Sequence, residues 1–211
     1  MAIKNDREYR NMTIEVRTFD EPDAEKMVVR GYASTFNEPY TLGEGDGWRL
    51  DEVVDERAFE NTDMSDVIMQ YDHQGRVFAR MSNDTLTVTP DERGLLIEAD
   101  LGGTELGRQL YDEIAKGYTN KMSFGFTVDG ETESRKKEDD GFTVYTRTIT
   151  SVRKLYDVSA VSIPATDATS ISVRNLTDGV IEQIRAERLE AEKLEIRKRK
   201  LLLKAKLNGG Q

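Results

Sequence analysis

The 211-residue chain contains no cysteine and only one histidine, His73. Without thiols it can form neither a disulfide nor a thiolate metal site, and one imidazole is too few for a zinc site built from His and Cys. No run of about 18 apolar residues is present, which excludes a membrane-spanning helix of the usual kind. The opening MAIKNDREYR has no apolar core and does not resemble a secretory signal. We therefore expect no metal, no cofactor, no membrane partner and a cytoplasmic location.

Apolar residues are also scarce, at 37%, against 33% charged residues. This balance predicts that part of the chain lies outside a packed core. The net charge of -10 argues against general nucleic-acid binding, which needs a basic surface. The length suits one domain of ordinary size with an appendage.

Alternating apolar and polar residues predict a chain dominated by strands between residues 12 and 175. Strands are expected over 12–20, 27–36 and 48–54, in hairpins within 66–82 and 84–101, from 121 onward, and twice within 142–165. A loop is expected at 37–48 and a charged hairpin tip at 131–141. Short helices are expected over 55–63 and 103–117, the second with Leu106, Leu110 and Ile114 on one face and Gly117 at its end. The predicted class is α+β, mainly β, a closed or partly closed antiparallel β-barrel with surrounding helices.

The composition changes near residue 177, which predicts a domain of 1–176 followed by a charged helical tail of 177–211. No Gly or Pro interrupts the tail between Gly179 and Leu207, and Glu, Arg, Lys, Leu and Ala dominate, as in a long helix. Its segment 196–207 carries six basic residues and no acidic one. The apolar stripe is sparse, so the tail is a weak coiled coil, a docking segment or a solvated helix.

Ser123 lies in the sequence YTNKMSFGFTV (118–128), between the predicted helix and a predicted strand. It is either an ordinary loop residue or a nucleophile, and a nucleophilic serine of the common kind needs an imidazole base. The only candidate base is His73, and a lone histidine in a turn is more often a surface residue than a catalytic base. Lys121 stands where a Gly-x-Ser-x-Gly elbow has its first glycine, which argues against an α/β-hydrolase. No Gly-rich loop with Gly-Lys-Ser/Thr is present, which argues against a P-loop enzyme.

Paired carboxylates offer a second chemistry, that of glycosidases. The pairs are Asp51/Glu52, Asp55/Glu56, Asp91/Glu92 and Asp139/Asp140. All are expected in turns or helix caps, as solvated groups, and nothing in the sequence brings two of them to one cleft. The acid-rich loop 44–51 lacks the spacing of an EF-hand.

The order of several motifs is more specific than any one of them. VVRGYASTFNEPY is followed by DERAFENT, VIMQYDHQGRVFAR, GLLIEADLGGTELGRQLYDEIAKGYTNKMSFGF and LYDVSAVSIPATDATSISVR. This succession, over roughly residues 27–175, resembles the prohead (procapsid) maturation serine proteases of tailed phages. Those enzymes share a fold with the herpesvirus assembly proteases.

The resemblance implies that Ser123 is the nucleophile, His73 the general base and Asp157 the third catalytic residue. An acid in the apolar strand around Asp157 would be costly without a task, and a carboxylate can orient the imidazole. The family often has an acid directly after the histidine, whereas here Gln74 follows and Asp72 precedes. Asp72 is thus a rival, but neighbours on an extended strand point to opposite faces, which favours Asp157.

The surroundings of Ser123 carry further expectations. Gly125 is expected to permit a close backbone approach, while Phe124 and Phe126 anchor the strand in the core. The oxyanion hole is expected from backbone N–H groups near Ser123 or after Pro164.

The resemblance also implies a function and partners. It implies an endopeptidase that cleaves scaffold segments, or the N-terminal region of the major capsid protein precursor, and itself. This would occur inside the assembling prohead in the host cytoplasm, and the viral relatives suggest a homodimer. One alternative is a non-catalytic capsid assembly or scaffolding protein with a degenerate protease-like barrel, although such a copy could readily have lost Ser123 or His73. Another is a β-barrel binding module, which explains neither the order of motifs nor Asp157.

Overall fold

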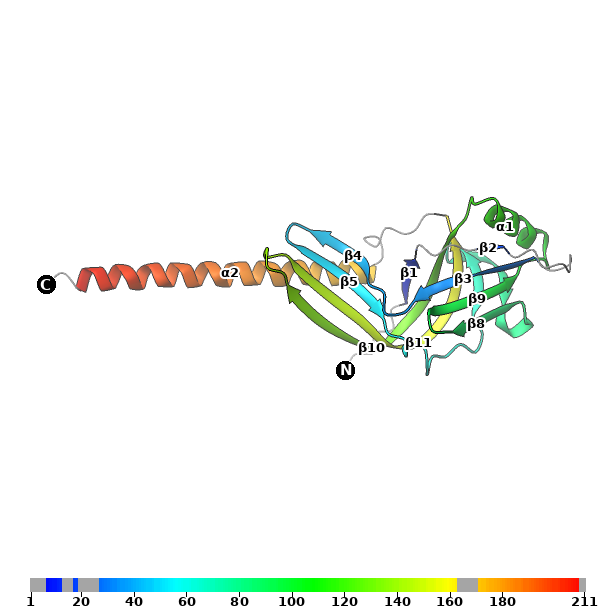
Figure 1. The fold of residues 1–211 in the computed structure, drawn as a ribbon, viewed down its shortest axis with the longest axis horizontal. Coiled ribbons are helices and arrows are strands. Elements are labelled where there is room, and N and C mark those ends of the chain that lie inside the picture. The colour runs from blue at the N-terminus through cyan, green and yellow to red at the C-terminus, as the bar shows by residue number, and fades with distance from the viewer. Residues whose placement is uncertain (1–6, 13–16, 19–26, 163–170, 209–211) are drawn as a thin grey trace.

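The computed structural model describes residues 7–12, 17–18, 27–162 and 171–208. These residues form a mainly β structure from which one long helix projects (Figure 1). The strands are β1 (Glu8–Met12), β2 (Arg17–Thr18), β3 (Val28–Thr35), β4 (Tyr40–Gly45), β5 (Trp48–Val54), β6 (Ile68–Tyr71), β7 (Gln74–Arg80), β8 (Leu86–Pro90), β9 (Gly94–Asp100), β10 (Lys121–Lys137) and β11 (Thr143–Val161). The helices are the 3-10 turn η1 (Met81–Asn83), α1 (Glu105–Ala115) and α2 (Ile171–Asn208).

The described strands form two open sheets. The larger has the order β1-β10-β11-β5-β4, with β6 and β7 added at β11, and the smaller has the order β2-β3-β9-β8. The mainly β class is confirmed. The barrel is not, because no pairing among the described strands closes either sheet. The expectation of purely antiparallel pairing is wrong, since β11 pairs in parallel with β5 and, further along, with β6.

The main core lies between the two sheets and is closed by α1. Phe124 and Phe126 lie fully buried in this core with stacked rings 4.5 Å apart, as the sequence predicted. On α1, Leu110 and Ile114 are buried while Leu106 is 38% exposed, so the predicted apolar face is narrower than its spacing indicated. The helix ends as predicted, because Gly117 has φ +77°, a left-handed conformation that glycine adopts without a steric cost.

Several predicted boundaries are correct and several are wrong. The hairpins β6–β7 and β8–β9 are confirmed. The predicted helix over 55–63 is instead a series of turns. The Asp55 carboxylate accepts from the Arg57 N–H as an N-cap would, but the main-chain bonds that follow, such as Ala58 N–H to Asp55 O and Glu60 N–H to Arg57 O, span three residues rather than the four of an α-helix. The predicted loop 37–48 contains β4, and 142–165 contains one long strand, β11, rather than two. The predicted excursion at 131–141 is mostly strand, since β10 continues to Lys137.

The N-terminal strand prediction is only partly tested. Residues 17–18 pair antiparallel with β3, consistent with the predicted hairpin of 12–20 and 27–36. The intervening turn at 21–26, and Pro164 at the other end of the domain, lie outside the described residues.

The long C-terminal helix is confirmed as α2, which begins at Ile171 and extends away from the sheets (Figure 1). Its Val180 and Ile184 pack against Leu42, Leu50 and Tyr145 of the larger sheet. Beyond this contact its large apolar side chains are exposed: Leu189, Leu194, Ile196 and Leu201. In the described part of the chain no helix is both long and apolar enough to cross a membrane.

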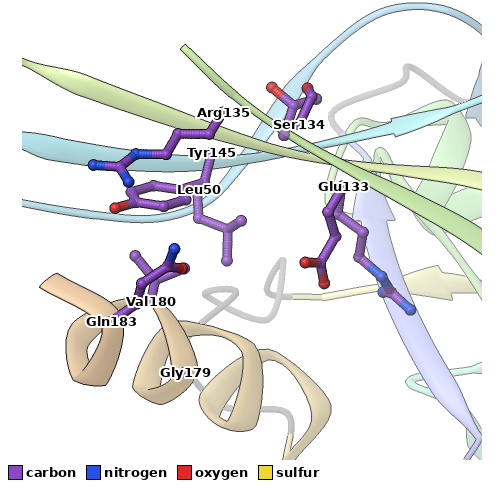
Figure 2. A pocket seen from close by; sticks show the side chains of 10 residues that line it. Leu50, Glu133, Ser134, Arg135, Tyr145, Gly179, Val180 and Gln183 are labelled. Atoms are coloured by element: carbon purple, nitrogen blue, oxygen red, sulfur yellow. The ribbon is translucent and has the colours of Figure 1, made fainter. Parts of the chain in front are cut away.

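A cavity of about 460 Å³ separates α2 from the β10–β11 hairpin (Figure 2). It is lined by apolar groups of Leu50, Tyr145 and Val180 and by polar side chains of β10. None of the predicted catalytic residues lines it. The cavity therefore belongs to the contact between helix and sheet and is separate from the predicted catalytic residues.

Candidate active site

Strands β10 and β11 bring the side chains of Ser123, Asp157 and Ser159 to one face of the larger sheet. Ser123 is paired with Ser159, and Gly125 is paired with Asp157. Directly opposed residues and residues two apart on a strand share a face. Ser123 and Asp157 therefore lie diagonally across two neighbouring strands, held by the ladder of main-chain hydrogen bonds.

His73 reaches this face from the tight turn between β6 and β7. Asp72 and His73 both have positive φ, 49° and 57°, as the two central residues of a type I′ hairpin turn do. The Asp72 carboxylate accepts hydrogen bonds from the main-chain N–H and the hydroxyl of Ser162, at 2.9 and 2.8 Å. Asp72 thus ties the turn to the end of β11, and it does not bind the imidazole.

The three predicted residues are connected by hydrogen bonds. His73 Nδ1 lies 2.5 Å from Asp157 Oδ1, and His73 Nε2 lies 2.5 Å from Ser123 Oγ. Because an ionised carboxylate only accepts hydrogen bonds, Nδ1 carries the imidazole proton. The lone pair of Nε2 therefore faces the serine hydroxyl, which is the tautomer required of a base.

Asp157 has further partners. Ser159 Oγ donates to Oδ1 at 3.0 Å, and the Arg7 guanidinium forms an ion pair with Oδ2. Room for this carboxylate depends on Gly125, because a Cβ there would lie 2.5 Å from Asp157 Oδ2. The close approach predicted at Gly125 is thus real, but the group that approaches is the carboxylate rather than backbone.

The site is deeply buried. Ser123 and Asp157 are 0% exposed, while the His73 side chain is 15% exposed. Burial, and to a smaller extent the positive charge of Arg7, together lower the pKa of His73 to about 4 against an opposing effect of Asp72. The imidazole is therefore neutral at neutral pH and able to accept a proton.

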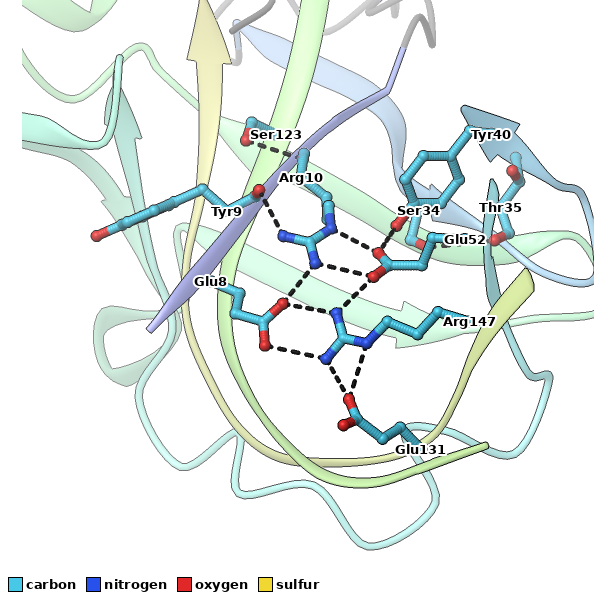
Figure 3. A network of polar contacts seen from close by, with 10 residues as sticks. All are labelled: Glu8, Tyr9, Arg10, Ser34, Thr35, Tyr40, Glu52, Ser123, Glu131 and Arg147. Carbon is cyan, nitrogen blue, oxygen red and sulfur yellow. Dashed lines mark hydrogen bonds and ion pairs between the residues drawn. The ribbon is translucent and has the colours of Figure 1, made fainter. Parts of the chain in front are cut away.

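Strand β1 pairs with β10 along the edge that faces away from β11, and there it covers Ser123. In their antiparallel pairing Asn11 lies opposite Ser123, and Ser123 Oγ lies 2.9 Å from the main-chain carbonyl oxygen of Arg10 (Figure 3). The hydroxyl has a single proton and two acceptors, this carbonyl and His73 Nε2. Only one of them can receive the proton at a time.

The opposite face of the same strands holds a buried network of charges (Figure 3). Arg10 binds both oxygens of Glu52, at 2.5 and 2.8 Å, and Arg147 binds Glu52 at 2.6 Å and Glu8 at 2.8 and 3.1 Å. Glu131 joins through Arg147, and Tyr40 donates to Glu52. Burial alone would raise the pKa of Glu52, but the charges of Arg10 and Arg147 hold it below its usual value.

The sequence pattern does not predict this network. Asp51 and Glu52 are expected from the sequence to be solvated residues of a turn or helix cap, whereas both lie buried in β5. The available signal was the strand pattern of WRLDEVV, which places an acid between apolar residues. Among the described residues no group of three or more His, Asp or Glu is arranged to hold a metal ion. The segment after Pro164 that was expected to contribute to an oxyanion hole lies outside the described residues.

Comparison with known proteins identifies the family of the chain. A family model described as caudovirus prohead serine protease matches residues 12–182. The matched range contains Ser123, His73 and Asp157 and omits Arg7 to Asn11. Neither the curated proteins nor the solved structures contain a match.

Proposed function

We propose that this chain, which belongs to the caudovirus prohead serine protease family, cleaves peptide bonds with Ser123 as nucleophile, His73 as general base and Asp157 as the group that orients the imidazole. Membership of that family implies a protease role in capsid maturation. The observation that supports the residue assignment is the continuous hydrogen-bonded chain from Ser123 Oγ through both imidazole nitrogens to Asp157. A neutral imidazole in this tautomer is suited to deprotonate the serine.

The reaction proceeds through an acyl-enzyme. Ser123 Oγ attacks the scissile carbonyl carbon while its proton passes to His73 Nε2, and the Asp157 carboxylate stabilises the imidazolium that forms. The tetrahedral intermediate then expels the amine, which takes the proton from Nε2. A water molecule repeats the sequence on the ester, releases the acid product and restores the Ser123 hydroxyl.

The substrates we assign are scaffold segments or the N-terminal region of the major capsid protein precursor, and the protease itself. Cleavage takes place within the assembling prohead in the host cytoplasm, and the enzyme acts as a homodimer. The tail 177–211 serves as a docking segment or is itself removed. Support for a docking role comes from its exposed apolar side chains and its charged surface beyond Val180.

The complete burial of Ser123 favours a second candidate, a non-catalytic assembly protein that keeps the protease fold. A buried hydroxyl cannot reach a substrate without a local rearrangement. The hydrogen-bonded His73 and Asp157 weigh against this candidate, because a protein without catalysis has no use for that tautomer. The two candidates differ in whether substitution of Ser123 changes proteolysis.

The experiment is intact-mass measurement after expression, alone and together with the major capsid protein. It compares the wild type with Ser123→Ala, His73→Ala and the control Ser134→Ala, a serine exposed on the same strand. Trimming of the wild type and the control, but of neither site variant, is expected. Identical trimming in all four would assign the cuts to a host protease. No trimming in any of them, even with the capsid protein, would favour the non-catalytic candidate.

A further inference from the structure

The strand position beside Ser123 is filled by the chain itself. β1 pairs with β10 from Glu8 opposite Phe126 to Met12 opposite Met122, and it forms the edge of the larger sheet. A polypeptide substrate that adds to a sheet edge does so through main-chain hydrogen bonds of this kind. The edge of β10 therefore has the geometry of a peptide-binding groove that is already occupied.

The residues of β1 and the one before it also contact the catalytic groups. The Arg10 carbonyl competes with His73 for the proton of Ser123, and the Tyr9 ring lies 4.3 Å from the imidazole ring. Arg7 binds the Asp157 carboxylate, and its positive charge opposes the imidazolium that acylation must form. The contacts of Arg10 and Arg7 thus restrain the chemistry rather than assist it.

The family match covers residues 12–182, so it includes Met12 of β1 and leaves Arg7, Tyr9 and Arg10 outside it.

We propose that the edge of β10 beside Ser123 is the groove for the main chain of the polypeptide substrate, and that β1 is an internal competitor that must leave it before cleavage. This inference rests on the proposed function and adds the mode of substrate binding. The substrate takes the place of β1 as an extended strand and brings its scissile carbonyl to Ser123. Until then the hydroxyl stays covered.

The groove also selects the substrate by charge. Arg10 occupies a buried position against both oxygens of Glu52, and when β1 leaves with Arg10 and Glu8, Glu52 must share the Arg147 guanidinium with Glu131. An uncompensated buried carboxylate is unfavourable, so a cationic side chain is favoured at this position. The substrate therefore carries Arg or Lys immediately N-terminal to the residue that lies opposite Ser123.

A reversible lock on β1 tests the first part of the proposal. Met12 and Met122 are directly opposed, and opposed Cα atoms in an antiparallel pair are about 4.5–5.5 Å apart, within the range that a disulfide spans. Because the natural chain has no cysteine, Met12→Cys/Met122→Cys introduces the only two thiols. The probe is a fluorophosphonate, whose phosphorus bonds to Ser123 Oγ as fluoride leaves and the hydroxyl proton passes to His73. Intact mass and peptide mapping follow the label.

In the full-length double variant we expect Ser123 to be labelled at least about 100-fold more slowly when oxidised than after reduction with dithiothreitol. The single variants Met12→Cys and Met122→Cys should not respond to the reductant. Equal labelling of both redox forms would overturn the proposal and leave the proposed function intact. Absence of label on Ser123 in either form would overturn the proposed function, and the inference with it.

Two further measurements keep the result independent of how well the double variant folds. Arg7→Gln in the otherwise natural chain, which loses the ion pair to Asp157, should be labelled several-fold faster than the wild type, and an unchanged or slower rate would count against release of β1.

The peptide Arg-Glu-Tyr-Arg-Asn-Met, which copies residues 7–12, should slow labelling of Arg7→Gln. A matched peptide with Glu in place of its second Arg should need at least about 10-fold higher concentration, and equal potency would overturn the charge preference.

Discussion

The two faces of the β1–β10 pair carry polar clusters of opposite character. On one face the chain Ser123–His73–Asp157 includes a hydroxyl whose single proton has two acceptors. On the other face, Arg10 and Arg147 are bound by carboxylates from three different strands. Both clusters are buried and both depend on residues 7–10. One has a proton that can move, and the other consists of permanent charges that are fully paired.

This difference indicates that one cluster is suited to catalysis and that the other holds the strands together. A catalytic cluster needs groups that can pass a proton during the reaction, so it contains histidine and an incompletely satisfied hydroxyl. An anchor needs groups whose charge does not change, which is why it contains arginine and carboxylates of lowered pKa. The predictions below separate the two roles by changing one face at a time.

The largest effect is expected from Asp157→Asn on the catalytic face. An amide in place of the carboxylate favours the wrong imidazole tautomer, so the rate of fluorophosphonate labelling at Ser123 should fall by about 10³–10⁴-fold. The control is Ser159→Ala, which removes one hydrogen bond to the same carboxylate and should cost less than about 10-fold. A rate for Asp157→Asn within 10-fold of the wild type would show that Asp157 does not orient His73.

On the anchoring face, Arg147→Ala should destabilise the fold by about 3–5 kcal/mol, because it leaves Glu8 and Glu52 buried with too few partners. The measurement is urea unfolding followed by circular dichroism. Arg153→Ala is the matched control, since Arg153 pairs with Asp129 on the surface and should cost less than about 1 kcal/mol. Equal losses in the two variants would mean that the network contributes no more than an exposed ion pair.

A smaller effect is expected on the titration of His73, whose pKa of about 4 lies below the ordinary value. As the pH falls from about 6.5 towards 4, the unfolded chain binds a proton that the folded chain does not, so stability decreases over this window. Arg7→Gln removes one cause of the lowered pKa of His73, so it should raise this pKa. The loss of stability between about pH 6.5 and 4 should then be smaller. As the chain has one histidine, proton NMR reports its titration without assignment. An unchanged midpoint in Arg7→Gln would contradict the contact between Arg7 and the site.

The smallest effect is expected at the helix. Glu187 pairs with Arg135 at an exposed position, so Glu187→Gln should change the free energy of unfolding by less than about 1 kcal/mol. Urea unfolding under the conditions used for Arg147→Ala gives a direct comparison. A loss above 2 kcal/mol would mean that the ion pair, and not the packing of Val180 and Ile184, holds α2 to the sheet.

The sequence predicted the elements whose signals are local. The hairpin β8–β9 followed from alternation around a turn, and α1 followed from its apolar spacing and Gly117. The choice of Ser123, His73 and Asp157 came from the order of motifs, and the structure brings these side chains together; their catalytic roles remain the proposal.

The features that the sequence did not predict depend on interactions between residues far apart in the chain. The burial of Glu52 depends on Arg10 and Arg147, 42 and 95 residues away, and no local pattern encodes that pairing. The covering of Ser123 by β1 likewise joins positions 11 and 123. β4 was missed because its glycines resemble a loop, while its pairing with β5 decides the conformation.

The unbroken course of β11 restricts how the length of this chain can change in evolution. The same strand carries Tyr145, which packs under α2, and Asp157, which binds the imidazole. Side chains alternate between faces along a strand, and the shifts in the β10–β11 register within this interval set which face each one takes. Insertion or loss of a single residue between these positions would therefore turn one of them to the wrong face. We expect length variation among relatives to avoid this interval, or to occur there in pairs of residues or with a compensating bulge. Turns such as 138–142 are free of that constraint.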